Sequence, residues 1–79
     1  MTLTEFVDNY SAGWCKPYAS RYSTLVSGYN TLALDDSKSS TPSHPSLIAF
    51  IAVDDKIVIV SENLSNTQIF KDFLKTIEI

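Results

Sequence analysis

The apolar residues near the N-terminus recur with the spacing of an α-helix. Five of them fall at i, i+3, i+4, i+7 and i+11, which is one stripe of a helix: Leu3, Phe6, Val7, Tyr10 and Trp14. Thr2 and Glu5 have the spacing of a capping box, in which each side chain accepts a hydrogen bond from the other residue's backbone N–H. Because Gly13 weakens a helix and Pro17 stops it, we expect this helix to end near Gly13 or Trp14.

The segment from residue 19 to residue 34 fits either two strands or a helix. Two strands, at residues 21–26 and 29–34, would flank Ser27-Gly28, which has the composition of a two-residue hairpin turn. A helix would instead place four large residues on one stripe: Tyr18, Tyr22, Leu25 and Tyr29. The tyrosine, threonine, leucine and valine content favours the strands, and the helix remains the alternative.

Residues 35–46 are predicted to form a flexible loop. The stretch has five serines, two prolines and no large apolar residue, so it has nothing to bury and is typical of a linker. We interpret the acid pair Asp35-Asp36 at its start as turn chemistry, since aspartate is common in turns.

Two apolar runs, at residues 47–53 and 56–61, predict a second hairpin with Asp54-Asp55 as its turn. In this pairing Val53 faces Lys56. One face of the hairpin then carries Ile48, Phe50, Ala52, Ile57 and Ile59. The other face carries Ala49, Ile51, Val53, Val58 and Val60. Both faces are apolar, which differs from an ordinary antiparallel sheet with one face in water.

The C-terminal segment predicts a second amphipathic helix. Its apolar residues form one stripe: Ile69, Phe70, Phe73, Leu74 and Ile77. Ser65 and Gln68 have capping-box spacing at its start. Lys75 lies near its end, where a positive charge suits the helix dipole.

The order of these elements predicts one α+β domain that spans residues 1–79. The simplest assembly is a two-layer fold, in which a four-stranded antiparallel sheet carries the N-terminal and C-terminal helices on one face. If residues 19–34 were helical, the order would instead be α-α-β-β-α.

Charge and length exclude several functions. The 79 residues have a net charge of −3, and Arg21 is the only arginine, so we expect no nucleic-acid binding. No segment approaches the ~20 apolar residues of a membrane span, so we expect no membrane partner. The N-terminus lacks the basic segment of a signal peptide, and Cys15 is the only cysteine. Together these features predict a reducing, cytoplasmic location.

Candidate chemistry is sparse. Cys15 and His44 are the only soft metal ligands, so we expect no metal site. A nucleophile–base pair of the same two residues would need a shifted thiol pKa, which nothing in the sequence implies. Two glycines, Gly13 and Gly28, are too few for a phosphate-binding loop. We therefore expect no cofactor and no enzymatic activity.

An apolar sheet face that no helix covers would be the working surface, because large exposed apolar patches usually mark interfaces. Tyrosines are also common at such sites. The predicted contact residues are Ile51, Val53, Val58, Val60, Tyr18, Tyr22 and Tyr29. The sequence thus predicts a small acidic protein-binding module that acts as an inhibitor or adaptor, a class that includes phage-encoded and immunity-type proteins. The alternative is a structural subunit, as a homodimer or in a larger complex, and a small enzyme is the least favoured.

Overall fold

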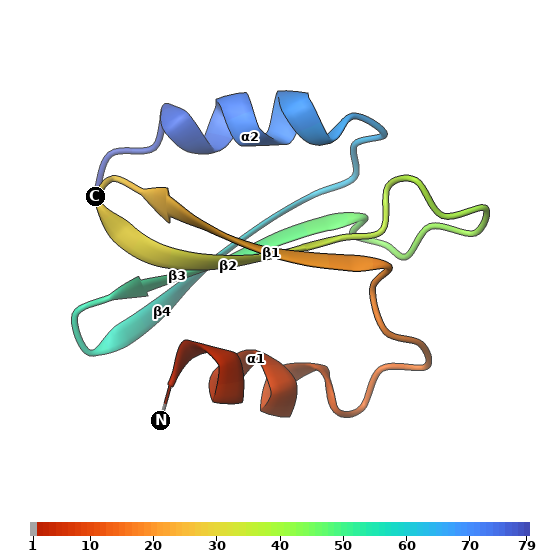
Figure 1. The fold of residues 1–79 in the computed structure, drawn as a ribbon, viewed down its shortest axis with the longest axis horizontal. Coiled ribbons are helices and arrows are strands. Elements are labelled where there is room, and N and C mark those ends of the chain that lie inside the picture. The colour runs from red at the N-terminus through yellow and green to blue at the C-terminus, as the bar shows by residue number, and fades with distance from the viewer. Residues whose placement is uncertain (1) are drawn as a thin grey trace.

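Four antiparallel strands and two helices make up the fold (Figure 1). The computed structural model describes residues 2–79. Within this range the elements are α1 Leu3–Ser11, β1 Ser20–Val26, β2 Tyr29–Asp35, β3 Leu47–Val53, β4 Lys56–Glu62 and α2 Thr67–Lys75. The strands lie in chain order, so β1 and β4 are the two edges of the sheet. The predicted order α-β-β-β-β-α is confirmed, and residues 19–34 form strands, not a helix.

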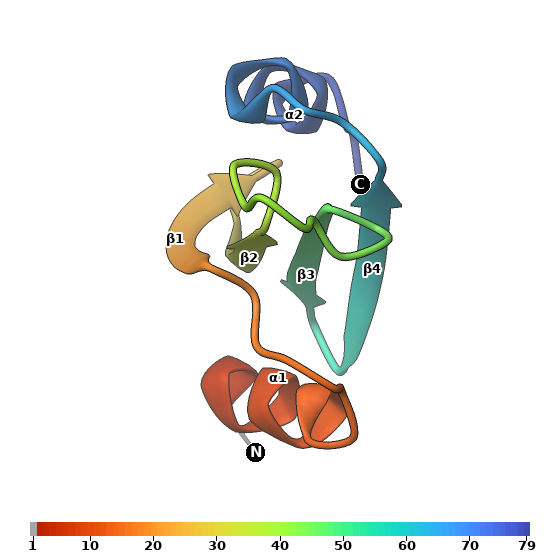
Figure 2. The same ribbon diagram turned by 90° about the vertical axis from the view of Figure 1, so that its right-hand side faces the viewer.

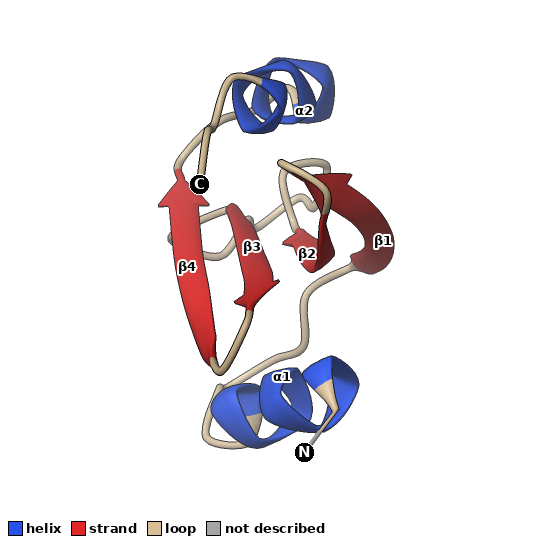
Figure 3. Ribbon diagram, turned by 90° about the vertical axis from the view of Figure 1, so that its left-hand side faces the viewer, coloured by secondary structure: helices blue, strands red, loops and turns tan. Residues whose placement is uncertain are grey.

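The two helices lie on opposite faces of the sheet (Figures 2 and 3). On the α1 face, Val7 of the helix packs with four buried strand residues: Leu32, Leu34, Ile48 and Phe50. On the α2 face, Phe70 and Leu74 of the helix join a second buried cluster: Val26, Ala33, Leu47, Ala49, Ile51 and Val53. The structure thus has three layers instead of the two expected, because both faces of the sheet are apolar and each needs a cover of its own.

Both hairpins turn through two residues. Ser27 and Gly28 both have positive φ values (53° and 82°), which gives their turn the twist that two-residue hairpins prefer. Asp54 has a φ of 54°, a left-handed conformation that aspartate adopts more readily than most residues. The predicted pairing of the second hairpin is confirmed, with Val53 opposite Lys56.

The helix caps match the sequence for α1 and differ for α2. The N–H of Thr2 donates to Oε1 of Glu5 (3.0 Å), and the N–H of Glu5 donates to Oγ1 of Thr2 (3.1 Å), which confirms the capping box. Helix α1 ends at Ser11, earlier than predicted. The N-cap of α2 is Asn66 and not Ser65, because the Asn66 side chain accepts two of the free backbone N–H groups of the first turn.

The apolar stripe of α2 is split between the core and the surface. Phe70 and Leu74 are buried against the sheet. Ile69 and Phe73 lie on one flank of the helix and are 54% and 42% exposed. The stripe expected from the sequence is therefore wider than the surface that the sheet buries.

This split predicts unequal effects on stability. Phe70→Ala should lower the free energy of unfolding by about 3–5 kcal/mol, because it leaves a cavity in the core. Phe73→Ala removes a ring of the same size from a half-exposed position and should lower it by about 1 kcal/mol or less. Urea denaturation of the two variants measures both values, and equal losses would contradict the placement of α2.

Candidate functional site

A groove of about 740 Å³ lies on the α1 face of the sheet. One wall is the linker between α1 and β1 (residues 12–19), and the other is the loop between β2 and β3 (residues 36–46). The large apolar residues that line it are Tyr10, Trp14, Tyr18, Pro45, Ile48 and Ile59. We call it the aromatic groove. A concave, mainly apolar surface of this size is typical of a binding site.

The aromatic side chains of the groove form a chain of contacts that starts in the core. The ring of Tyr10 packs edge-on against the buried Phe50, with ring centroids 5.3 Å apart. Trp14 packs edge-on against Tyr10 at 6.0 Å, and Tyr18 lies 5.0 Å from Trp14. Edge-on packing of this kind is favourable for aromatic rings. The wall of the groove is therefore held by the core and not by solvent-exposed contacts alone.

The carboxylate of Asp36 joins the two walls of the groove. Its side chain is only 2% exposed, and it forms an ion pair with Nζ of Lys16 at 3.2 Å. It also accepts hydrogen bonds from the N–H of Ala19 (3.0 Å) and the N–H of Ser43 (2.7 Å). Lys16 and Ala19 belong to the linker, and Ser43 belongs to the loop. A single buried charge thus binds two segments that lie far apart in the sequence.

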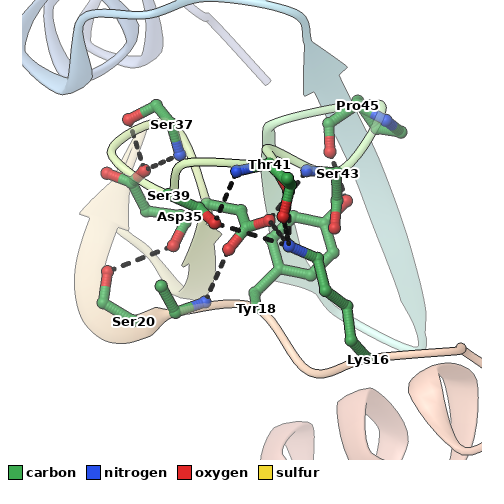
Figure 4. A network of polar contacts seen from close by, with 11 residues as sticks. Lys16, Tyr18, Ser20, Asp35, Ser37, Ser39, Thr41, Ser43 and Pro45 are labelled. Atoms are coloured by element: carbon green, nitrogen blue, oxygen red, sulfur yellow. Dashed lines mark hydrogen bonds and ion pairs between the residues drawn. The ribbon is translucent and has the colours of Figure 1, made fainter.

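Further hydrogen bonds tie the same two segments together (Figure 4). Nζ of Lys16 donates to the carbonyl oxygen of Thr41, and the hydroxyl of Tyr18 donates to the carbonyl oxygen of Pro45. At the far end of the loop, the hydroxyl of Ser46 accepts the N–H of Leu64 at 3.0 Å. The expectation that this loop buries nothing is wrong for Asp36 and Ser46, because their polar groups find partners inside the protein.

The environment of Asp36 holds its pKa low. Burial acts to raise the pKa, but the hydrogen bonds from Ser43, Lys16 and Ala19 outweigh it and lower the pKa to about 2. The carboxylate is therefore charged at neutral pH, in spite of its burial. It acts as a structural anchor of the groove.

Asp35, the last residue of β2, anchors the start of the loop to α2. It accepts the N–H and the hydroxyl of Ser37 at 2.8 and 2.6 Å, and the hydroxyl of Thr67. Burial acts to raise its pKa, and these hydrogen bonds lower it further than burial raises it. The interpretation of Asp35-Asp36 as turn chemistry does not account for these contacts with other segments of the chain. The sequence signal for this anchoring role is an acid pair followed by many serine and threonine residues.

The predicted contact residues do not form one surface. Ile51 and Val53 are buried beneath α2 and offer almost no accessible area. Val58 and Val60 are half-buried on the same face, at the edge strand β4. Tyr22 and Tyr29 also pack on that face, and Tyr22 lies under Nζ of Lys71 at 4.9 Å from its ring centroid. Tyr18 alone lines the aromatic groove.

Cys15 and His44 both line the aromatic groove, although they are far apart in the sequence. Among residues 2–79, no hydrogen bond joins the thiol to the imidazole. A nucleophilic cysteine needs a base within hydrogen-bonding reach. The described part of the chain also contains no group of three or more histidine, cysteine or acidic residues that could hold a metal ion.

Comparisons with protein-family models, with curated proteins and with solved structures found no match to this chain. Among residues 2–79, neither helix has the combination of length and apolar character that a membrane crossing requires.

The Asp36 anchor predicts a large effect for a small chemical change. Asp36→Asn keeps the size of the side chain but removes the charge and replaces one acceptor oxygen with an N–H group, which then faces another donor, so that donor loses its acceptor. We expect it to lower the free energy of unfolding by about 2–3 kcal/mol. Asp55→Asn, in the exposed turn between β3 and β4, is the matched control and should change it by about 0.5 kcal/mol or less. Similar values for both variants in urea denaturation would show that Asp36 anchors nothing.

The low pKa of Asp36 also predicts a pH dependence. The folded-state pKa of about 2 lies below the ordinary value of 3.8, so the stabilisation is complete above about pH 5 and is lost as the pH falls through 3.8 towards 2. Asp36→Asn lacks this group. The difference in unfolding free energy between the wild type and the variant should therefore shrink by about 1–2 kcal/mol between pH 5 and pH 2. A difference that stays constant over this range would contradict the assignment.

Proposed function

We propose that the protein is a small protein-binding module whose contact surface is the aromatic groove. The observation that supports this is the exposure of large side chains in a concave site: Tyr10 is 48% exposed and Ile59 is 40% exposed. Aromatic side chains that line a preformed pocket are frequent anchors of protein interfaces. The occupant that fits best is a short apolar segment of another protein.

The groove is organised before any partner arrives. Its aromatic wall packs on Phe50, and its two sides are bound together by Asp36 and Lys16. A preorganised surface loses less conformational entropy on binding than a mobile one. This favours a module that binds its partner without large rearrangement and that acts as an inhibitor or adaptor.

The charges of the described surface favour a protein partner over a nucleic acid. The chain has a net charge of −3, and its only arginine, Arg21, pairs with Asp8 at 2.9 Å. Lys16 at the groove is paired with Asp36. Nucleic-acid binding requires clustered free cations that displace counterions. We therefore propose an apolar peptide segment as the ligand class.

The sole tryptophan, Trp14, makes this proposal measurable, because it lies in the groove. Peptides selected against the wild type from a random phage-display library should be apolar, and their binding should shift the fluorescence of Trp14 to shorter wavelength. Tyr10→Ala should weaken the binding by about tenfold or more, since it removes an anchor of the groove. Leu25→Ala is the matched control, because Leu25 is 63% exposed and does not line the groove.

Two outcomes would contradict the proposal. One is a selection that yields no peptide with affinity above a scrambled sequence. The other is a set of peptides that bind Tyr10→Ala as tightly as the wild type and leave the fluorescence of Trp14 unchanged. Circular dichroism of each variant serves as the control for folding.

A further inference from the structure

Strand β4 forms an edge of the sheet, and its interior lacks the features that usually protect an edge strand. Between Lys56 and Glu62 it has no charge, no proline and no glycine. Neither helix reaches its outer side (Figures 2 and 3). Among residues 2–79, no other segment forms a hydrogen bond with the backbone of residues 57–61 on that side. An edge of this kind is a template for pairing with another strand.

The backbone of β4 offers hydrogen-bonding groups to the open edge at every second residue. The two-residue turn directs the N–H of Lys56 towards Val53, its partner in β3. Because the groups alternate along an antiparallel ladder, four residues face β3: Lys56, Val58, Val60 and Glu62. The three that face the open edge are Ile57, Ile59 and Ser61. These three are centred on Ile59, the middle residue of the strand.

A second copy of β4, antiparallel to the first, matches this edge when Ile59 lies on a two-fold axis. Ile59 is then opposite Ile59 of the partner subunit, and Ile57 is opposite Ser61 of the partner subunit. Each outward-facing residue thus meets another outward-facing residue. Pairs of this type exchange both of their N–H···O bonds, so no backbone group of the three residues stays unpaired.

The same register brings opposite charges together at both ends of the strand. Lys56 lies opposite Glu62 of the partner subunit, and the symmetry repeats this pair at the other end. Opposite charges directly across an antiparallel pair stabilise it, and like charges destabilise it. Registers displaced along the strand place Lys56 opposite a valine or beyond the end of β4. The charges therefore select the register that the backbone also favours.

The other edge of the sheet does not have this self-complementarity. Strand β1 has polar residues along most of its length: Ser20, Arg21, Ser23 and Thr24. Centred on its middle residue, Ser23, an antiparallel copy would place Arg21 opposite Leu25 of the partner subunit. Arg21 already pairs with Asp8 of α1 at 2.9 Å.

Exposed apolar residues of α2 extend the surface beside β4. Lys71 and Lys75 border a small pocket that β1 forms with α2, so this side of the helix faces β1. Ile69 and Phe73 lie on the opposite side of the helix, by helical spacing, and both are exposed. They would flank the joined strands on the α2 face.

We infer that two copies of this chain associate through β4 and form one continuous antiparallel sheet, with Ile59 at the two-fold axis. The inference does not rest on the proposed peptide ligand, because it is carried by the backbone and the charges of β4. The two copies present their α1 faces on the same side, so their aromatic grooves lie next to each other.

The first test is the mass in solution. Sedimentation equilibrium of the wild type should show a concentration-dependent species with twice the chain mass of 8.8 kDa. Ile59→Lys brings two like charges together at the axis and should abolish it. Leu25→Lys changes an exposed leucine of the other edge strand and should leave it intact. A wild type that stays monomeric up to millimolar concentration, or a dimer that survives Ile59→Lys, overturns the inference.

The register is tested by exchanging the charges. Lys56→Glu and Glu62→Lys, each alone, turn two attractive pairs into repulsive ones and should each raise the dimer dissociation constant by about tenfold or more. The double variant Lys56→Glu/Glu62→Lys restores the pairs and should return the constant to within about threefold of the wild type. The two positions lie at opposite ends of β4, so a recovery has no explanation within one chain. Additive losses in the double variant overturn the register.

Amide hydrogen exchange gives a reading that needs no variant. The N–H of Ile59 should be protected from exchange at high protein concentration and exposed after dilution, whereas the N–H of Val58 should be protected at both. Equal, concentration-independent protection at the two positions overturns the inference. The peptide experiment on Tyr10 is unaffected by this result, so failure of one proposal is distinguishable from failure of the other.

Discussion

The hairpin of β3 and β4 carries apolar side chains on both of its faces, and the rest of the architecture follows from this. Phe50 lies on one face of β3 and Ile51 on the other, and both are fully buried. If either face of the sheet were open to water, one of these side chains would be exposed. Burying a side chain of that size contributes about 1.5–3 kcal/mol, so both faces need a cover. The two helices, α1 and α2, provide these covers, one on each face of the sheet.

Each helix covers one face of the sheet, and the apolar residues that stay exposed differ between the two faces. Helix α1 is short, and its aromatic stripe continues past its end into the linker, where Trp14 and Tyr18 form the groove. Helix α2 buries Phe70 and Leu74 and leaves Phe73 exposed. Neither helix covers the linker before β1 or the loop between β2 and β3. Polar contacts hold these segments instead, because the carboxylate of Asp36 binds both of them.

Much of the fold follows from local patterns. The turns at Ser27-Gly28 and Asp54-Asp55 specify the strands beside them and their register, because a two-residue turn fixes which residues of the two strands lie opposite each other. The face of the sheet that each helix covers could not be predicted, since a sheet that is apolar on both sides accepts a helix on either side. The role of Asp36 was also missed. Its partners, Lys16 and Ser43, come from segments whose proximity depends on the whole fold.

The order of the strands in the sheet has a consequence for the way the chain folds and opens. Every strand pairs with its neighbour in the sequence, so the sheet assembles from local contacts, which favour rapid folding. The two buried clusters lie on opposite sides of the sheet, and each contains one helix. Detachment of α1 would therefore disrupt the cluster around Val7 and leave the one around Phe70 in place. We therefore expect each helix to detach locally without the other, while the remaining cluster keeps the sheet folded.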